Sequence, residues 1–280
     1  MIKIAVPNKG SLSERAAVIL REAGYKSRYN KALNIIDEAN GVEFYFLRPN
    51  DIAIYVAAGH LDLGITGRDL ALDSRAEVEE ALPLGFGRST FRFACMAEED
   101  WTVEQLEGKR IATSYPHLVT DYLAERGIKA SVIRLEGAVE ISIKLGVADV
   151  IADVVSTGNT LRQHGLKPFG EPIVASEAIV YRRKGAEITD EQQVLLRRIR
   201  GILTAHTYFM LDYNVSRDQL EEAIAVTPGL SGPTVSPLSR DNWVAVRAMV
   251  PCDTANGVMD KLHALGAEAI LASELRIARI

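Results

Sequence analysis

Over the first two thirds of the chain, short apolar runs alternate with longer stretches in which apolar residues recur at helical spacing. The short runs predict β-strands and the longer stretches predict amphipathic helices. Strands that alternate with helices are typical of an α/β fold with mostly parallel sheets. We expect strands at residues 2–6, 42–47, 61–66, 91–96, 110–113, 131–135, 147–152 and 177–181, and helices at 12–23, 50–58, 118–126, 139–145 and 190–205.

Two segments of this region share one pattern, which indicates two similar lobes. Residues 59–67 and 146–153 each begin at a glycine, continue through an aspartate, and close in a short strand. We interpret residues 1–90 and 91–176 as two α/β lobes, with about 177–206 returning to the first. Their strand ends would face each other across a cleft, where open parallel sheets bind ligands. The alternative is chance similarity, because all α/β units resemble one another.

The pattern changes after the amphipathic helix at 190–205. Strands are expected at 208–213, at the end of the Pro/Gly/Ser-rich segment 227–237, at 243–250 and at 269–277, with helices at 217–225 and 255–265. The order βαββαβ is that of a ferredoxin-like domain. We therefore expect a third domain at residues 207–280.

The most informative stretch is VIADVVSTGNTL at residues 150–161, where an apolar strand opens into a small polar turn at a helix start. Backbone N–H groups and small hydroxyls of such a turn point at one spot, where the helix dipole favours an anion. Gly158 lets the backbone approach a ligand closely. Asp153, expected at the carboxyl end of the strand, can accept from sugar hydroxyls or help to hold Mg²⁺. The alternative is a capped turn that binds nothing, since Ser/Thr/Gly turns are common.

Several cationic side chains fall near expected strand ends. Lys9 lies before a helix start, Arg48 follows the strand at 42–47, and Arg68 follows the strand at 61–66. A single cation of this kind is usually a solvated surface charge. Several cations at strand ends together favour a site for a polyanionic ligand. Tyr115 either stacks on a base or packs in the core.

Composition excludes several classes of protein. The chain has 280 residues, of which 48% are apolar, and a net charge of −5. This charge argues against a general nucleic-acid or anionic-membrane binder. Cys95 and Cys252 suggest neither a disulfide framework nor a zinc site, and this cysteine usage is consistent with a protein of the reducing cytosol. We expect no signal peptide and no membrane span.

Nothing in the chain suggests a nucleophile paired with a base. There is no G-x-S-x-G, C-x-x-C or H-E-x-x-H motif, and the five histidines are scattered. This fits a reaction in which one substrate attacks another and the enzyme supplies position and charge.

Long motifs resemble the ATP phosphoribosyltransferase family in its long form, over essentially the whole chain. They are PNKG at 7–10, FLRPNDIAIYV at 46–56, LDLGITGRDL at 61–70 and GAVEISIKLGVADVIADVVSTGNTL at 137–161, with TPGLSGPTVSPL and GAEAILASELRI near the end. The resemblance implies a periplasmic-binding-protein-like catalytic unit and a ferredoxin-like (ACT-like) regulatory domain. It also implies that N1 of ATP attacks C1′ of phosphoribosyl pyrophosphate, in the first step of histidine biosynthesis. Pyrophosphate then leaves with Mg²⁺.

Residue roles follow from the same motif match. Asp153, Glu140 and Lys9 would be catalytic, with Glu140 near the ribose hydroxyls. Mg²⁺ would be held mainly by substrate phosphates and by Asp153. Asn159 departs from the family pattern, because close relatives tend to carry arginine there. The resemblance places Asp153, Ser156, Thr157, Gly158, Asn159, Thr160 and Leu161 on phosphoribosyl pyrophosphate, and Lys9, Gly10, Arg48, Arg68, Asp69, Ser89, Thr90 and Tyr115 on ATP.

The resemblance further implies inhibition by L-histidine, a cytoplasmic location and a homo-oligomer, as dimer and hexamer. Asn214, Leu230, Thr234 and Ala269 would contact histidine, unless residues 227–237 form only a connector. No nucleic-acid or membrane partner is expected. Two other functions stay open: a two-lobed solute-binding protein, and an amino-acid sensor in which the lobes are scaffold.

Overall fold

The computed structural model describes residues 1–26 and 32–279, and it divides into two compact units. Unit 1 comprises Met1–Arg21 and Tyr25–Gln192, and unit 2 comprises Glu22–Gly24 and Gln193–Ile280. In these described ranges no helix combines the length and the hydropathy needed to cross a membrane.

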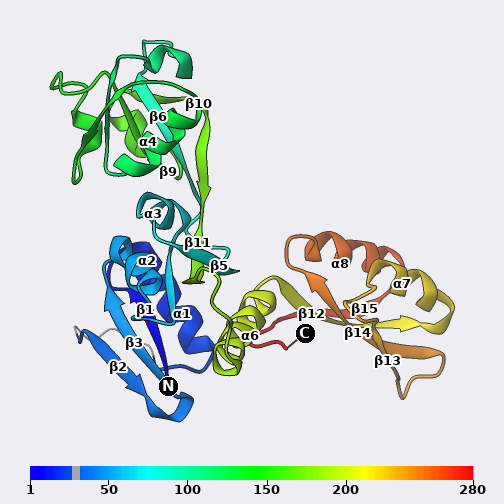
Figure 1. Cartoon of the computed structure of the whole chain (residues 1–280). Helices are drawn as coiled ribbons and strands as arrows, with labels where there is room; N and C mark the ends of the chain where they lie inside the picture. The colour runs from blue at the N-terminus through cyan, green and yellow to red at the C-terminus, as the bar shows by residue number, and fades with distance from the viewer. Residues whose placement is uncertain (27–31, 280) are drawn as a thin grey trace. The chain divides into compact units, whose positions relative to one another are not determined.

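The first lobe of unit 1 is built on a six-stranded sheet in the order β2-β3-β1-β4-β11-β5 (Figure 1). β1 runs parallel to β3 and β4, whereas the other pairings are antiparallel. The expectation of a mostly parallel sheet is therefore wrong, because β2 pairs antiparallel with the next strand, β3, and β11 returns from the second lobe in the opposite direction. The strands are β1 (Ile2–Pro7), β2 (Asn34–Asp37), β3 (Val42–Leu47), β4 (Leu63–Gly67), β5 (Val78–Pro83) and β11 (Ala178–Arg183); the helices are α1 (Gly10–Glu22), α2 (Pro49–Ala57), α3 (Arg68–Asp73) and the 3₁₀ turn η1 (Glu38–Asn40).

Close packing of α2 on β4 depends on one glycine. A Cβ built on Gly64 would lie 2.5 Å from Ile52 Cγ2 and 2.8 Å from Val56 Cγ2. Both of these side chains are completely buried. The absence of a side chain at Gly64 thus lets the helix rest directly on the strand.

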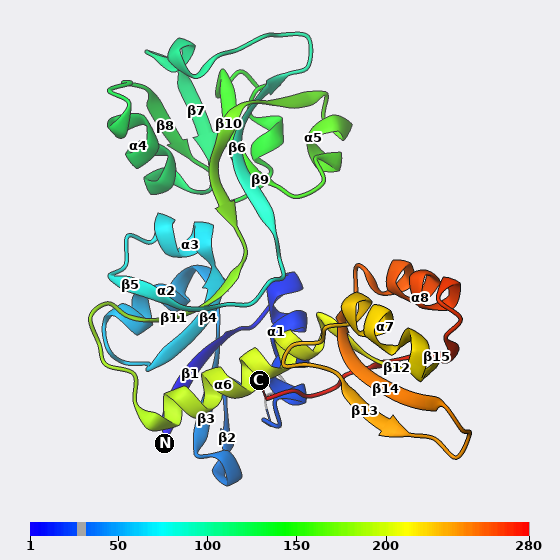
Figure 2. The same ribbon diagram turned by 90° about the vertical axis from the view of Figure 1, so that its right-hand side faces the viewer.

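The second lobe has a five-stranded sheet in the order β10-β6-β9-β7-β8 (Figure 2). β7 is parallel to β8 and β9, and β6 is antiparallel to β9 and β10. Phe91, Phe93 and Phe169 lie in its core, with the rings of Phe93 and Phe169 stacked at 5.8 Å. The strands are β6 (Ser89–Met96), β7 (Arg110–Thr113), β8 (Ser131–Arg134), β9 (Val150–Val155) and β10 (Leu166–Ser176); the helices are η2 (Val103–Leu106), α4 (Pro116–Glu125), η3 (Val139–Ile141) and α5 (Asn159–Gln163).

Two expectations for this lobe are wrong. The helix expected at 139–145 is a single 3₁₀ turn, η3. The strand expected at 147–152 is β9, Val150–Val155, so Asp153 lies within the strand and not at its end. Val154 and Val155 continue the strand because they pair with Phe91 and Thr90 of β6.

Unit 2 carries a four-stranded antiparallel sheet in the order β13-β14-β12-β15. This order and the βαββαβ succession are those of a ferredoxin-like domain, which confirms the prediction. Tyr213, Val246 and Leu262 belong to its core cluster. Its elements are β12 (Tyr208–Ser216), η4 (Arg217–Gln219), α7 (Leu220–Val226), β13 (Thr234–Pro237), β14 (Trp243–Pro251), α8 (Ala255–Ala264) and β15 (Glu268–Glu274), preceded by the helix α6 (Asp190–Ala205).

Candidate functional site

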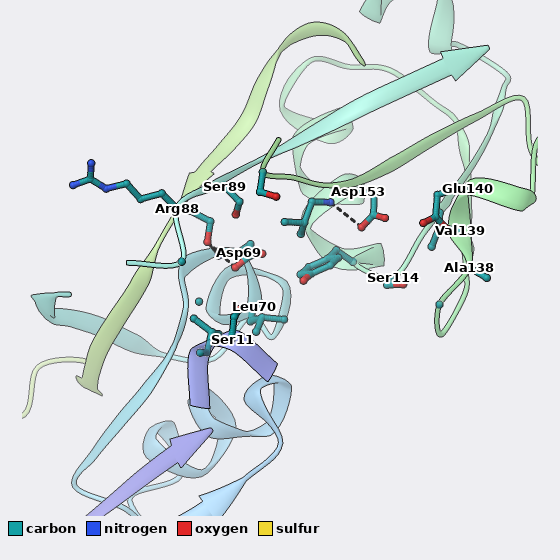
Figure 3. A pocket seen from close by; sticks show the side chains of 18 residues that line it. Ser11, Asp69, Leu70, Arg88, Ser89, Ser114, Ala138, Val139, Glu140 and Asp153 are labelled. Carbon is teal, nitrogen blue, oxygen red and sulfur yellow. Dashed lines mark hydrogen bonds between the residues drawn. The ribbon is translucent and has the colours of Figure 1, made fainter. Parts of the chain in front are cut away.

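A cavity of about 530 Å³ in unit 1 is lined by residues of both lobes (Figure 3). The first lobe contributes the start of α1 and of α3, and the second contributes η3, β9 and the start of α4. The lining comprises Ser11, Leu12, Gly67, Asp69, Leu70, Gly87, Arg88, Ser89, Ser114, Tyr115, Gly137, Ala138, Val139, Glu140, Asp153, Val154, Ser156 and Ser176.

Asp153 faces this cavity from β9. Burial raises the pKa of its carboxyl group to about 6, and the negative charges of Glu140 and Asp69 act in the same direction. The N–H of Val154 opposes the shift by donating to Asp153 Oδ1 at 2.7 Å. Arg92 stands opposite Asp153 on β6, but its guanidinium donates to the carbonyl oxygen of Gly170 at 2.5 Å. The cavity is therefore acidic, and it favours a ligand with positive charge or with hydroxyl donors.

A strained turn brings Glu140 to the cavity. Ala138, the residue before η3, has φ 51°, in the left-handed region that alanine seldom adopts. The preceding Gly137 has φ 140°. This turn replaces the expected helix and presents Glu140 to the cavity. Backbone strain of this kind is concentrated at functional sites.

Asp69 is held in place from two sides. It is buried, and its Oδ1 accepts a hydrogen bond of 2.7 Å from the hydroxyl of Ser176 on β10. The Asp69 backbone N–H donates to the same hydroxyl oxygen at 3.2 Å. The Tyr115 hydroxyl of the second lobe hydrogen-bonds to Asp69, and burial together with the charges of Asp69 and Asp153 raises the pKa of Tyr115. A Cβ at Gly67 would overlap the Asp69 carboxylate, so a side chain at this position would displace that carboxylate.

The phosphate-loop sequence forms a tight turn between β9 and α5. Gly158 has φ 70°, and Ser156 reaches the cavity lining. Arg162 donates to the carbonyl oxygen of Thr157 at 3.2 Å and to Asn159 Oδ1. A cation therefore does stand at this loop, about one helical turn beyond Asn159. Arg162 was not among the predicted site residues, although it follows Asn159 by only three positions.

The cavity brings together only part of the residues expected there. Among the described residues it gathers Asp69, Ser89, Tyr115, Glu140, Asp153 and Ser156. It also includes Ser11, Arg88, Ser114 and Ser176, which were not among the predicted site residues. Outside the lining lie Lys9, Gly10, Arg48, Arg68, Thr90, Thr157, Gly158, Asn159, Thr160 and Leu161.

Three of the residues outside the lining have their side chains engaged elsewhere. Arg68 donates to both carboxylate oxygens of Glu80, at 2.6 and 3.1 Å, and this pairing raises its pKa. The Thr90 hydroxyl donates to the carbonyl oxygen of Val155 at 3.3 Å. Leu161 is buried in the core of the second lobe. Lys9 and Arg48 are exposed.

Family models match nearly the whole region that builds this cavity and the domain after it. The model described as "ATP phosphoribosyltransferase" matches residues 48–201, and "HisG, C-terminal domain" matches residues 205–277. The ATP phosphoribosyltransferase of Corynebacterium glutamicum is 71% identical over 281 residues, covering all of both chains. That of Rhodococcus jostii is 60% identical, covering 100% of this chain and 99% of its own. This chain belongs to the ATP phosphoribosyltransferase family.

Solved structures agree with the fold of this ATP phosphoribosyltransferase family member. The ATP phosphoribosyl transferase (HisG:HisZ) complex of Thermotoga maritima gives a TM-score of 0.64 at 24% identity, covering 73% of this chain and 99% of that chain. A putative L-cystine ABC transporter of Listeria monocytogenes gives 0.51 at 12% identity, with 73% and 91% covered. The two lobes thus have a periplasmic-binding-protein-like fold.

As an ATP phosphoribosyltransferase family member, the protein is a transferase of histidine biosynthesis, from a family that needs a divalent metal ion. In the described part of the chain, no three His, Cys, Asp or Glu side chains are grouped so that they could hold a metal ion alone. The carboxylates of Asp153, Glu140 and Asp69 nevertheless surround one cavity. Such a donor set fits a hard cation that keeps water ligands and shares substrate phosphates.

In unit 2 of this ATP phosphoribosyltransferase family member, two expected histidine contacts share one sheet face. Asn214 of β12 is opposite Ala245 of β14, and Thr234 of β13 is opposite Arg247, two residues further along. Since side chains alternate along a strand, Asn214 and Thr234 lie on the face away from the core. Ala269, with φ 50°, stands where β15 has one residue more than β12 between its pairings. Leu230 is 43% exposed in the turn before β13.

Proposed function

We propose that the enzyme joins N1 of ATP to C1′ of phosphoribosyl pyrophosphate, giving N1-(5-phosphoribosyl)-ATP and pyrophosphate. The observation that carries this proposal is the cavity between the lobes, where three carboxylates surround one space beside the loop at 156–158. The family of the chain supports the same reaction.

The proposed roles follow from the chemistry of pentosyl transfer. Departure of pyrophosphate leaves positive character at C1′, which the carboxylates of Asp153 and Glu140 would stabilise. The loop from Ser156 to Thr160 would hold the 5-phosphate through backbone N–H groups and hydroxyls. Asp69 and Tyr115 would face the adenine, with Ser89 beside the phosphates. Lys9, Gly10, Arg48, Arg68 and Thr90 remain predicted nucleotide contacts that lie outside the cavity lining.

No protein nucleophile is required in this scheme. The described lining residues include no histidine, and the lining hydroxyl that donates to a carboxylate, that of Ser176, holds the buried Asp69 in place. The enzyme would accelerate the reaction by aligning N1 with C1′ and by excluding water from the reacting centre. Each substrate then supplies one partner of the new bond.

Mg²⁺ is the proposed metal ion. Asp153, and through its charge Glu140, would share it with the substrate phosphates. When bound, it would neutralise the charge that develops on the departing pyrophosphate. The raised pKa of Asp153 supports a role in holding the metal ion. The ionised form of a carboxyl group that is buried among acids is unfavourable, and a nearby cation stabilises it.

We further propose that L-histidine inhibits the enzyme by binding to unit 2 on the open sheet face at Asn214, Leu230, Thr234 and Ala269. Arg247 and Asp212 form an ion pair at 2.7 Å on this face, beside Thr234. A side chain of each charge is thus present to meet an amino acid's carboxylate and ammonium groups. Leu271 on the same face is 63% exposed, which supports an oligomer in which such faces meet. We expect this oligomer in the cytoplasm, as dimer and hexamer.

The proposed reaction is tested by incubating the protein with ATP, phosphoribosyl pyrophosphate and Mg²⁺. We expect pyrophosphate release and a changed adenine absorbance only when both substrates are present, and none when EDTA is added. Pyrophosphate release without ATP would indicate hydrolysis of the donor and would contradict the proposal. Titration of the active enzyme with L-histidine then tests inhibition.

A further inference from the structure

The helix α4 of the second lobe is capped by a residue of the first lobe. α4 begins with Pro116 after Tyr115, and Tyr115 supplies no side-chain cap. Asp73, at the end of α3, fills this role because its Oδ1 accepts the N–H groups of His117 at 2.9 Å and of Leu118 at 3.0 Å. These are two of the N–H groups that the first turn of a helix leaves without partners.

α3 and α4 lie close to each other (Figure 2), and two more side-chain contacts join these parts of the chain. His117 Nδ1 lies 2.8 Å from the carbonyl oxygen of Asp73, and since a carbonyl can only accept, this nitrogen carries the proton. Arg75 donates from Nε to Asp121 Oδ2 at 3.0 Å and also forms an ion pair with Asp121. We call these five residues, Asp73, Arg75, His117, Leu118 and Asp121, the α3–α4 clasp.

The backbone at Arg75 is unfavourable for its residue type. Arg75 has φ 52° just after α3, where glycine is the usual residue. Its side chain nevertheless extends to Asp121 in the other lobe. A strained non-glycine residue at a helix end indicates that the side chain has a role there which glycine could not fill.

The clasp lies directly beside the cavity. Tyr115 immediately precedes α4 and lines the cavity, and Asp69 lies one helical turn before Asp73 on α3. α3 thus presents one carboxylate to the Tyr115 hydroxyl and the next to the N-terminus of the same helix. Any separation of α3 from α4 would move Tyr115 away from Asp69.

We propose that Asp73 is a positioning residue: by capping α4 across the two lobes, it fixes Tyr115 against Asp69 and so sets the width of the substrate cleft. The inference rests on the proposed function only in taking this cavity as the substrate site. Asp73 itself is absent from the cavity lining and is not a catalytic residue.

Four variants test this role. Asp73→Ala removes the cap, and Asp73→Asn keeps a side-chain oxygen that caps nearly as well. Arg75→Gly removes the ion pair and relieves the backbone strain. Asp51→Ala is the matched control, because Asp51 is an exposed first-turn acid of α2 that lies outside the cavity lining.

We expect Asp73→Ala to raise KM for the substrates by about 2- to 30-fold, the range that loss of a helix cap gives, with a smaller change in kcat. Asp73→Asn should restore most of the loss, and Asp51→Ala should behave as the parent. Arg75→Gly should raise KM without lowering the unfolding temperature. Amide exchange at residues 117 and 118 should accelerate in Asp73→Ala alone.

The inference would be overturned by an unchanged KM in Asp73→Ala, or by Asp73→Asn that is as impaired as Asp73→Ala. Substrate affinities measured by calorimetry, together with amide exchange, test the role of Asp73 even if the protein shows no turnover. A parent protein that binds both substrates but forms no product would therefore refute the proposed reaction and leave the role of Asp73 to be decided by these measurements.

Discussion

Replacing Asp153 with asparagine should stabilise the protein at neutral pH while it impairs catalysis. The pKa of Asp153 is about 6, against an ordinary value of 3.8. Since one pH unit corresponds to about 1.4 kcal/mol, the ionised carboxylate costs the folded state about 3 kcal/mol, an upper value for a side chain that is not fully buried. Asparagine keeps the acceptor for the Val154 N–H and removes the charge.

The sign of the pH dependence follows from the raised pKa. Between pH 3.8 and about 6 the folded protein binds more protons at Asp153 than the unfolded chain does, so stability falls as the pH rises through this window. Asp153→Asn should therefore gain up to about 3 kcal/mol over the parent at pH 8 and nothing near pH 4.

Urea unfolding of both proteins at a series of pH values measures this difference. Asp149→Asn is a control in which the change in stability should have the opposite sign, because Arg110 pairs with Asp149 at 2.7 Å and lowers the pKa of its carboxyl group. That variant should lose stability at pH 8, and the loss should shrink as the pH falls below 3.8 towards the lowered pKa. If Asp153→Asn is no more stable than the parent at pH 8, Asp153 is not the buried, destabilised acid that we describe.

Three further predictions concern packing, the phosphate loop and inhibition. Gly64→Ala should cost about 1–3 kcal/mol in urea unfolding, because its Cβ would overlap Ile52; an unchanged midpoint would contradict the packing of α2 on β4. Gly158→Val should weaken binding of phosphoribosyl pyrophosphate, since its φ of 70° disfavours valine; wild-type turnover would remove the loop from the site. Asn214→Lys and Thr234→Ala should relieve histidine inhibition with basal turnover unchanged, and unchanged histidine affinity by calorimetry would exclude both residues.

Much of the fold followed from local patterns. The strand at 42–47 and the helix at 190–205 have the predicted bounds, because each combines clear periodicity with clear ends. β10 was missed because Pro168, Gly170 and Pro172 interrupt its apolar pattern, and only its antiparallel pairing with β6 makes it a strand. The helix predicted at 139–145 is only a 3₁₀ turn, and the left-handed backbone of the preceding Ala138 has no signature in an alanine residue.

The candidate site was harder to predict because its geometry depends on distant partners. The predicted site residues Asp153 and Tyr115 both line the cavity. The sequence pattern could not show that Arg68 pairs with Glu80, or that Ser176 holds Asp69 from 107 positions away. The capping of α4 by Asp73 is likewise a tertiary contact between helices that are separate in the sequence.

The central claim is that the two substrates react directly with each other in the cavity between the lobes. Its most direct test is the anomeric configuration at C1′ of the product, determined by nuclear magnetic resonance after a single turnover. We predict inversion relative to phosphoribosyl pyrophosphate, together with an unmodified protein by intact mass spectrometry. Retention of configuration, or a phosphoribosyl group attached to the protein, would contradict the account.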